Sequence, residues 1–423
     1  MNILILGSGG REHAFAWKIA QSSSCNKLII APGNAGTNQL GTNIDININD
    51  FDAVKDLVLS YEIDMVLVGP EAPLVNGIYD FFQQDEKLSS ISLIGPSAAG
   101  ARLEGSKHFA KEFMQRHNIP TAKHKTFTKE NINEGYEFID SLPSPYVLKA
   151  DGLAAGKGVM ILENVDEAKK ELKSMIIDKK FGEASSKVVV EEFLKGIELS
   201  VFIITDGTTY KILPSAKDYK RIGEGDTGLN TGGMGAVSPV PFADRFYIEK
   251  VEREIIKPTI DGLKKDNIKY KGFIFFGLIN VNGQPKVIEY NVRMGDPETE
   301  AVIPRIKSDL LNLFKGIDDG TFSEKDLHIV DDITATIMLV SAGYPNDYKK
   351  GKVIYGLEDI TDSLLFHSGT TVDDSDIKTN GGRVIAITAY GNTLEEAKET
   401  AYKDAEKINF EGKQYRGDIG FDL

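Results

Sequence analysis

Cysteine and histidine are scarce in this sequence. Of its 423 residues, one is a cysteine, Cys25, and six are histidines. A single cysteine rules out an intrachain disulfide and a cysteine-rich metal site. The histidines never fall at the spacing of a zinc-binding helix, so we expect no zinc site.

Long apolar runs and an excess of positive charge are also lacking. No stretch approaches the roughly 20 apolar residues that a membrane-spanning helix needs. The first residues carry no charged segment and reach glycine at Gly7, too early for a signal peptide. Asp and Glu (63) outnumber Lys and Arg (49), and the formal net charge of −14 disfavours binding to nucleic acid or an anionic membrane. We expect a cytoplasmic monomer that acts on small molecules.

Apolar segments alternate with helical patterns over residues 1–104. Strands are expected at residues 2–6, 28–31, 65–68 and 91–94, and helices from about residue 11 and over 51–61. This alternation predicts a parallel sheet with helices on its faces. Each strand runs into a glycine-containing loop, and ligands bind beyond the carboxyl ends of strands in such sheets. We therefore expect these loops to line one crevice.

The remaining residues are expected to form a central and a carboxy-terminal domain. A helix over 106–116 leads to a predicted hinge at Ile119-Pro120, and a small lid subdomain should follow at about 121–193, with strands at 146–150 and 188–192 and a helix at 166–179. Near the end, strands are expected at 333–341 and 383–389, before a helix capped by Thr393. The predicted fold class is α/β and α+β multidomain: a parallel α/β domain (1–104), a two-part central domain (105–327) and an α+β domain (328–423).

One predicted hairpin carries an informative polar pattern. An apolar strand at 272–281 is joined by an Asn-Gly turn to a strand predicted over 286–293. Side chains alternate along a strand, so Glu289, Asn291 and Arg293 would share one face. A carboxylate and an amide oxygen suit Mg²⁺, and a guanidinium suits a carboxylate or phosphate. An amphipathic strand with a solvated polar face would show the same pattern.

The loop Gly7-Ser-Gly-Gly-Arg-Glu12 follows a predicted strand, as a dinucleotide-binding fingerprint does. Its third glycine position holds Glu12, and no acidic residue between Glu12 and Asp45 could bind a ribose. A role in hydride transfer is therefore disfavoured. A tight turn at a helix start still suits a phosphate, with Arg11 beside it.

A second glycine-rich loop, Asp151-Gly-Leu-Ala-Ala-Gly-Lys-Gly-Val159, resembles a P-loop. Asp151 replaces its first glycine, and Gly158 replaces the Ser or Thr that would bind Mg²⁺, so it is not a Walker loop. The glycines nevertheless expose backbone N–H groups, and Lys149 and Lys157 add positive charge. We expect the loop to bind phosphate.

Several motifs, in order from end to end of the chain, resemble one enzyme family. Lys107, Lys149, the 152–158 loop, Glu198 and Glu289-x-Asn291-x-Arg293 resemble the ATP-grasp superfamily. More narrowly, seven motifs closely resemble the phosphoribosylamine–glycine ligase (glycinamide ribonucleotide synthetase) family. They are Gly9-Gly-Arg-Glu-His-Ala14, Gly69-Pro-Glu-Ala-Pro-Leu74, Leu103-Glu-Gly-Ser-Lys107, Ala150-Asp-Gly-Leu-Ala-Ala-Gly-Lys-Gly-Val159, Asn230-Thr-Gly-Gly-Met-Gly-Ala236, Gly295-Asp-Pro-Glu-Thr299 and Arg416-Gly-Asp-Ile-Gly420.

The resemblance implies an ATP-dependent ligase of de novo purine synthesis. Such an enzyme joins glycine to 5-phosphoribosylamine through glycyl phosphate, giving glycinamide ribonucleotide, ADP and phosphate. It uses ATP as co-substrate with Mg²⁺ or Mn²⁺, and residues 1–104 and 105–327 would be its pre-ATP-grasp and ATP-grasp domains. Phosphoryl transfer of this kind needs positioning and charge neutralisation rather than a serine or cysteine nucleophile.

The resemblance also implies the roles of individual residues. Phosphates, adenine and ribose of ATP would be bound by Lys107, Lys149, Gly152, Gly156, Lys157, Gly158, the hinge Glu191, Glu192, Phe193 and Leu194, and Glu198. The metal ligands would be Glu289 and Asn291. The catalytic set would be Arg293, which also binds the glycine carboxylate or the transferring phosphoryl group, with Lys149, Asp218 and Asp296. The substrate phosphate is expected at Gly9, Gly10 and Arg11.

Three residues depart from the usual family pattern. Tyr219 stands where Asp-His-Lys is common, Leu229 where proline is common, and Glu300 where glutamine is common. None lies in the metal or nucleotide motifs, so they concern the substrate loops. Two other functions stay open: another ATP-grasp carboxylate–amine ligase with a formyl or carboxy donor, and a nucleotide- or dinucleotide-binding protein without turnover. A glycine requirement tests the first, and tight NAD binding tests the second.

Overall fold

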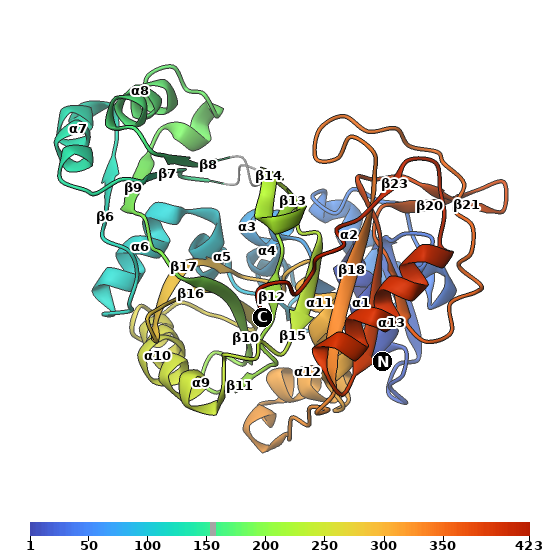
Figure 1. The fold of residues 1–423 in the computed structure, drawn as a ribbon. Helices are drawn as coiled ribbons and strands as arrows, with labels where there is room; N and C mark the ends of the chain where they lie inside the picture. The colour runs from blue at the N-terminus through green and yellow to red at the C-terminus, as the bar shows by residue number, and fades with distance from the viewer. Residues whose placement is uncertain (153–157) are drawn as a thin grey trace.

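The computed structural model describes residues 1–152 and 158–423 (Figure 1). The first sheet has the strand order β3-β2-β1-β4-β5, and its neighbouring strands all run parallel, as the sequence predicts. Its strands are β1 (Asn2–Gly7), β2 (Lys27–Pro32), β3 (Thr42–Asn43), β4 (Met65–Val68) and β5 (Ser92–Ile94). The strand order reverses beside β1, so the loops after β1 and β4 meet at the carboxyl edge of the sheet.

The central strands of this sheet are apolar on both faces, and helices pack on both. Leu4 of β1 shares a buried cluster with Phe82, whereas its neighbour Ile3 shares a different cluster with Phe15. Successive side chains of a strand point to opposite faces, so β1 contributes to both cores. The helices of this segment are α1 (Gly10–Ile19), α2 (Phe51–Ser60), α3 (Glu71–Val75), α4 (Ile78–Gln84) and α5 (Ala98–Gly105).

The segment after α6 (Lys107–Arg116) folds into a lobe that stands apart from the rest of the chain (Figure 1). Its antiparallel sheet has the order β6-β9-β7-β8, with strands β6 (His124–Phe127), β7 (Tyr146–Ala150), β8 (Val159–Leu162) and β9 (Val188–Glu192). Helices α7 (Ile132–Asp140) and α8 (Val165–Ile176) share a buried apolar cluster with this sheet. The strands predicted at 146–150 and 188–192 are confirmed, and the helix predicted to reach residue 179 ends earlier, at Ile176.

The central sheet is antiparallel and has the order β11-β10-β16-β17. Its strands are β10 (Ile197–Thr205), β11 (Tyr210–Ile212), β16 (Gly272–Val281) and β17 (Gln284–Asn291), and helices α9 (Arg245–Val251) and α10 (Lys257–Lys265) lie between β11 and β16 in the chain. The predicted turn between β16 and β17 is confirmed, because Asn282 and Gly283 have φ of 52° and 80°. Positive φ at both positions is what a two-residue hairpin turn requires.

The strand that carries the polar pattern is shorter than predicted. β17 ends at Asn291, so Arg293 lies beyond it. The backbone N–H of Val292 donates to Glu104 Oε2 at 2.8 Å, which takes the chain out of the sheet at this point. Pairing with β16 also shifts at Gly277, which leaves Ile288 as an extra residue in β17. The prediction that Arg293 extends the strand is therefore wrong, whereas Glu289 and Asn291 are confirmed as strand residues.

A third sheet combines strands from the middle and the end of the chain. Its order is β12-β15-β18-β22-β19, with β23 also paired to β18. These strands are β12 (Lys217–Asp218), β15 (Gly235–Ser238), β18 (Ile333–Ser341), β19 (Leu364–His367), β22 (Arg383–Gly391) and β23 (Lys413–Gln414). Helix α13 (Leu394–Lys407) packs on it, and Thr393 caps this helix as predicted by accepting a hydrogen bond from the Glu396 N–H.

Two small hairpins and two further α-helices are the remaining strands and α-helices of the described chain. They are β13 (Arg221–Gly223) with β14 (Thr227–Asn230), β20 (Thr370–Asp373) with β21 (Asp376–Thr379), α11 (Glu298–Val302) and α12 (Leu310–Asp319). Because β12 and β15 belong to the third sheet, residues before 327 help to build the carboxy-terminal layer. In the described part of the chain, no helix is both long and apolar enough to cross a bilayer.

Candidate active site

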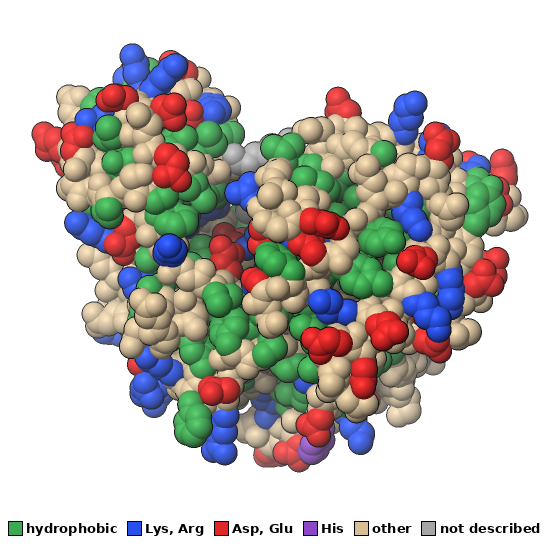
Figure 2. Space-filling view, viewed as in Figure 1, with side chains coloured by type: hydrophobic (Ala, Val, Ile, Leu, Met, Phe, Trp, Pro, Cys, Tyr) green, Lys and Arg blue, Asp and Glu red, His purple; other side chains and the backbone are tan. Residues whose placement is uncertain are grey.

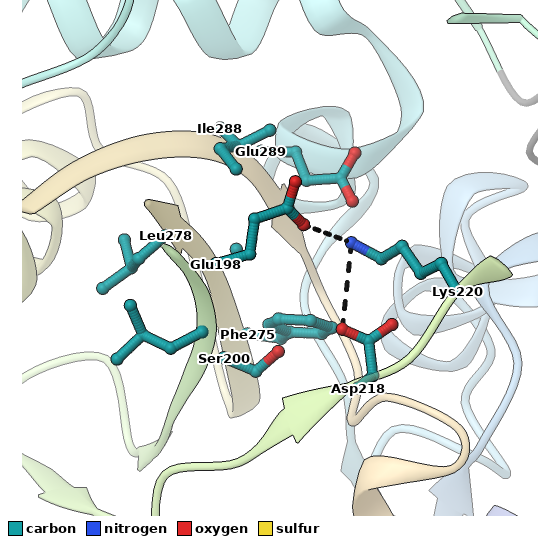
Figure 3. Close-up of a pocket in the computed structure, with 10 residues that line it drawn as sticks. Glu198, Ser200, Asp218, Lys220, Phe275, Leu278, Ile288 and Glu289 are labelled. Carbon is teal, nitrogen blue, oxygen red and sulfur yellow. Dashed lines mark hydrogen bonds and ion pairs between the residues drawn. The ribbon is translucent and has the colours of Figure 1, made fainter. Parts of the chain in front are cut away.

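A hollow separates the lobe of β6 to β9 from the rest of the chain, and charged side chains are visible within it (Figure 2). Beneath it, a small cavity lies between the central sheet and β12 (Figure 3). The central strands β10, β16 and β17 supply most of its lining. Its polar lining residues are Glu198, Ser200, Asp218, Lys220 and Glu289.

Lys149 and Glu191 form a buried pair on neighbouring strands of the lobe. Lys149 on β7 is 5% exposed and Glu191 on β9 is 3% exposed. Lys149 Nζ lies 3.1 Å from Glu191 Oε2 and donates to the carbonyl of Ile288 at 3.3 Å. Glu191 Oε1 is buried with no hydrogen-bond partner among the described residues. An unpartnered buried acceptor fits a ligand N–H donor, such as the amino group of adenine.

The other predicted hinge residues face in several directions. Glu192 accepts from the Lys123 N–H at 2.9 Å and lies 3.7 Å from Lys286, so it is engaged in the protein surface. Phe193 is 39% exposed, and Leu194 is partly exposed. Both follow the end of β9 directly.

The start of α6 brings Lys107 to the beginning of the glycine loop. Lys107 Nζ donates to the carbonyl of Gly152 at 3.5 Å. Asp151 accepts from the Ser106 hydroxyl at 2.8 Å and from the His108 N–H at 3.1 Å, so its carboxylate caps the helix. This cap explains why an acid stands where a P-loop would have glycine. Of the predicted loop residues, Gly156 and Lys157 lie outside the described residues.

Lys220 joins two carboxylates from different strands (Figure 3). Its Nζ lies 3.0 Å from Glu198 Oε2 and 3.9 Å from Asp218 Oδ1. The negative charge of Asp218, followed by that of Glu198, raises the pKa of Lys220 well above its ordinary value. The charge of Lys220 in turn lowers the pKa of Glu198, whereas burial raises that of Asp218. Lys220 thus brings together Glu198 and Asp218, whereas the roles predicted for them, toward ribose and toward the substrate amines, stay predictions.

Glu289 and Asn291 present two free oxygen groups on β17. Neither side chain has a hydrogen-bond or ion-pair partner among the described residues, and Asn291 is 9% exposed. Within the same residues, no group of three His, Cys, Asp or Glu side chains could hold a metal alone. A carboxylate and an amide oxygen fit Mg²⁺, which usually completes its shell with substrate phosphates and water.

Arg293 is held by two carboxylates from the amino-terminal segment. Its Nη2 donates to Glu104 Oε1 at 2.8 Å, and its Nε lies 3.5 Å from Glu71 Oε2. Glu104 lies on α5 and Glu71 on α3, so the guanidinium connects both helices with the end of β17. Its side chain keeps 18% exposure, which leaves part of the guanidinium accessible to a ligand.

Asp296 lies between two arginines after the central sheet. Arg383 Nη1 is 2.9 Å from Asp296 Oδ1, and the Arg11 N–H donates to Asp296 Oδ2 at 3.4 Å. Burial opposes ionisation of Asp296, but the charges of both arginines outweigh it and lower its pKa. Nearby, burial and the charge of Asp218 raise the pKa of Glu298 to about 7.

The side-chain carboxylate of Glu12 packs into the glycine turn before α1. Glu12 accepts from the Gly9 N–H at 2.6 Å and from Arg11 Nε at 2.7 Å. A Cβ placed on Gly7 or Gly69 would lie 2.5 or 2.0 Å from atoms of Glu12, so both glycines make room for it. This explains the missing third glycine of the fingerprint. With Gly9 and Arg11 engaged inside the protein, their contact with a substrate phosphate, and that of Gly10, stays a prediction.

The three departures from the family pattern have different surroundings. The Tyr219 hydroxyl donates to Asp422 near the chain end at 2.9 Å, so this side chain points away from the cavity. Leu229 on β14 is 51% exposed. Glu300 is fully buried, and neither carboxyl oxygen has a hydrogen-bond partner among the described residues.

Sequence reasoning missed five charged residues that shape this site: Lys111, Glu71, Glu104, Lys220 and Arg383. Lys111 lies four residues after Lys107 on α6, so helical spacing could have indicated it. Glu71 and Glu104 stand inside motifs that the sequence analysis quotes. Arg383 contacts Asp296 from β22, and no local pattern signals such a contact.

Three family models match successive parts of the chain. Residues 1–104 match the model described as Phosphoribosylglycinamide synthetase, N domain. Residues 105–299 match its ATP-grasp (A) domain, and residues 334–422 match its C domain.

Individual proteins show the same likeness. The chain is 43% identical over 425 residues to a phosphoribosylamine–glycine ligase of Pasteurella multocida, covering 100% of this chain and 98% of that protein. It is 44% identical over 426 residues to the bifunctional purine biosynthetic protein PUR2,5 of Pichia angusta, covering 99% of this chain but only 53% of that longer protein. A crystal structure of phosphoribosylamine–glycine ligase from Thermotoga maritima superposes with a TM-score of 0.85 and 36% identity, covering 99% of this chain and 100% of that one.

Proposed function

The chain belongs to the phosphoribosylglycinamide synthetase family, and we propose that it joins glycine to 5-phosphoribosylamine at the expense of ATP. The products are glycinamide ribonucleotide, ADP and phosphate, a step of purine biosynthesis. The observation that carries this proposal is the 43% identity, over nearly the full length of both chains, to a protein named phosphoribosylamine–glycine ligase.

The reaction has two covalent steps. A carboxylate oxygen of glycine attacks the γ-phosphorus of ATP, the bond to the bridging oxygen breaks, and ADP leaves with that electron pair. The substrate amine then attacks the carbonyl carbon of glycyl phosphate, the carbon–oxygen bond to phosphate breaks, and the amine loses a proton. Both steps place negative charge near the reacting atoms, so the side chains needed are mainly cations and oriented donors.

The buried lobe residues support nucleotide binding. Lys149 and Lys107 are proposed to contact ATP phosphates, together with the loop residues Gly152, Gly156, Lys157 and Gly158. The free oxygen of Glu191 is proposed to accept a hydrogen bond from the adenine amino group, with Glu192, Phe193 and Leu194 forming the rest of the hinge. Glu198 is proposed to bind the ribose hydroxyls, in exchange for its contact with Lys220.

Glu289 and Asn291 are proposed to hold Mg²⁺ or Mn²⁺. Bound metal would neutralise phosphate charge during transfer. The support is that both side chains lack partners among the described residues and end on oxygen atoms. Parallel activity titrations of wild type with Mg²⁺ and with Mn²⁺ distinguish the two ions.

The remaining substrate contacts are proposed from the charged groups near β17. Arg293 is proposed to bind the glycine carboxylate or the transferring phosphoryl group with its accessible face. Asp218 and Asp296 are proposed to contact the substrate amines. Gly9, Gly10 and Arg11 are proposed to bind the phosphate of 5-phosphoribosylamine.

The partners of the protein are proposed to be small molecules, without nucleic acid or membrane. A cytoplasmic monomer is proposed as well, supported by one cysteine in 423 residues and by the formal charge of −14. Light scattering after size-exclusion chromatography tests the monomer. The activity is tested by ADP release with 5-phosphoribosylamine generated in place, which should require glycine. Undiminished release without glycine, or with a formyl or carboxy donor in its place, would exclude the proposed reaction.

A further inference from the structure

Lys111 is a buried cation behind the proposed adenine site. It lies on α6 and is 2% exposed. Its Nζ is 3.0 Å from Glu191 Oε2 and donates to the Thr121 hydroxyl at 2.7 Å. A lysine is almost never fully buried without partners, because an unpaired buried charge is strongly unfavourable. Glu191 and Thr121 therefore stabilise the buried charge of Lys111.

These contacts connect the lobe with the strand of the proposed metal ligands. The Thr121 hydroxyl donates to the carbonyl of Val287 at 2.7 Å, and Lys149 donates to the next carbonyl, that of Ile288. Glu191 and Lys149 belong to the lobe, whereas Val287 and Ile288 belong to β17. Lys111 thus completes a set of buried and partly buried polar contacts between two parts of the proposed ATP site.

The charges of this set do not cancel. Lys111 and Lys149 share a single oxygen of Glu191, Oε2, at 3.0 and 3.1 Å. Burial opposes the ionisation of Glu191, but the charges of Lys149 and Lys111 outweigh it and lower its pKa. Within these three side chains two cations face one anion, and the charge of Glu289 also acts on Lys111. Without Lys111, Lys149 would be the only cation within ion-pair distance of Glu191 among the described residues.

We propose that Lys111 is a positioning residue for ATP, which acts through Glu191 and Lys149 without touching the nucleotide. It holds Oε2 of Glu191, so that Oε1 stays free for the adenine amino group. It also shares the neutralisation of Glu191, so that Lys149 keeps its charge for the phosphates. This inference rests on the proposed function of the same site.

A merely structural role for Lys111 makes different predictions from a positioning role. Inosine triphosphate has a carbonyl oxygen where ATP has its amino group, so it cannot donate to Glu191 Oε1. If Lys111 orients Glu191, its loss should reduce the preference for ATP over inosine triphosphate. If Lys111 only stabilises the fold, its loss should lower the melting temperature while the preference stays unchanged.

The test compares Lys111→Met with wild type in a glycine-dependent phosphate-release assay. We expect the KM for ATP to rise on the order of tenfold, and the ratio of kcat/KM for ATP to that for inosine triphosphate to fall by about the same factor. Lys111→Arg, which keeps the charge, should retain more of the preference than Lys111→Met. Arg116→Met on the exposed face of the same helix is the control, and it should match wild type in both quantities.

A folded Lys111→Met protein with a wild-type KM for ATP and a wild-type preference would overturn the proposal. If Lys111→Met does not fold, Lys111→Gln replaces it, because glutamine can still form hydrogen bonds but carries no charge. A wild-type KM for ATP and a wild-type preference in Lys111→Gln would then overturn the proposal. Binding of a non-hydrolysable ATP analogue, measured by calorimetry, separates this inference from the proposed reaction. Wild type that binds the analogue without glycine-dependent turnover would refute the reaction, and an unchanged affinity in Lys111→Met would refute the role of Lys111.

Discussion

The carboxylate of Glu104 binds two neighbouring residues, Arg293 through its guanidinium and Val292 through its backbone N–H. One carboxylate oxygen accepts from Arg293 Nη2 at 2.8 Å, and the other accepts from the Val292 N–H at 2.8 Å. Glu104 and Arg293 are 189 positions apart in the chain. A helix of the amino-terminal segment thereby fixes the direction in which the chain leaves β17, directly after the proposed metal ligands.

This arrangement predicts that loss of Glu104 destabilises the protein. Glu104→Ala would remove the nearer carboxylate of the Arg293 guanidinium and the acceptor of the Val292 N–H, and breaking a buried ion pair costs about 3–5 kcal/mol. Glu71→Ala is the matched comparison, because Glu71 is more exposed and lies 3.5 Å from the same guanidinium; we expect it to cost less than about 1 kcal/mol. Urea denaturation measures both. Equal costs would show that Glu104 has no special part in holding Arg293.

The proposed role of Arg293 is tested by Arg293→Lys. Lysine keeps the charge but lacks the planar group that can bind two oxygens at once. If Arg293 binds the transferring group in the transition state, turnover should fall by on the order of 2–4 kcal/mol in activation free energy, with little change in ATP affinity. If it only anchors glycine, the KM for glycine should rise instead. Wild-type kinetics in both Arg293→Lys and Arg293→Ala would remove Arg293 from the site.

The proposed metal site is tested by Glu289→Gln. The change keeps the shape of the side chain and removes the charge that attracts a divalent cation. We expect the Mg²⁺ or Mn²⁺ concentration for half-maximal activity to rise at least about tenfold, the factor that lost metal-site interactions typically cost. Glu249→Gln, on the exposed face of α9, serves as the control. Identical metal titrations for wild type and Glu289→Gln would place the metal elsewhere.

The buried Glu300 predicts a pH-dependent stability. Burial, followed by the charge of Asp296, raises the pKa of Glu300 well above its ordinary value. The stability that the neutral form contributes is fully present below the ordinary pKa of about 4.3 and is lost as pH rises through the folded-state pKa. The unfolded chain ionises Glu300 above about pH 4.3 while the folded chain keeps it protonated, so Glu300→Gln should gain stability relative to wild type as pH rises above that value. For a chain of 423 residues, a difference of 1 kcal/mol corresponds to roughly 1 °C in melting temperature.

Melting curves of wild type, Glu300→Gln and Glu249→Gln at each pH check this prediction. The charged groups that act on Glu300 are Asp296, Arg383 and Arg11, and they remain in all three proteins. The surface control should follow wild type at every pH. Parallel profiles for wild type and Glu300→Gln would show that Glu300 binds the same number of protons in the folded and unfolded states, and hence that its pKa is not raised by folding.

Local patterns predicted much of the fold. The Asn-Gly turn fixes the hairpin of β16 and β17, and Glu289 and Asn291 lie on its second strand as their spacing indicated. The parallel sheet followed from the alternation of apolar strands and helices. Such features depend on residues close in sequence, which is why sequence patterns reveal them.

Long-range contacts could not be predicted in the same way. The strand predicted through Arg293 stops at Asn291, because a helix far away in sequence binds the next backbone N–H. Similarly, Arg383 reaches Asp296 from the third sheet, and Lys111 meets Glu191 only when α6 packs on β9. Nothing in the local sequence around these residues indicates their partners.

The most direct test of the central claim uses glycine labelled with ¹⁸O in its carboxylate. With ATP, a divalent metal and 5-phosphoribosylamine generated in place, attack of the carboxylate on the γ-phosphorus places one labelled oxygen in the released phosphate. Mass spectrometry should find one ¹⁸O in each phosphate, in equal amount to the glycinamide ribonucleotide formed. Phosphate without the label, or released at the same rate when glycine is omitted, would contradict the proposed ligation.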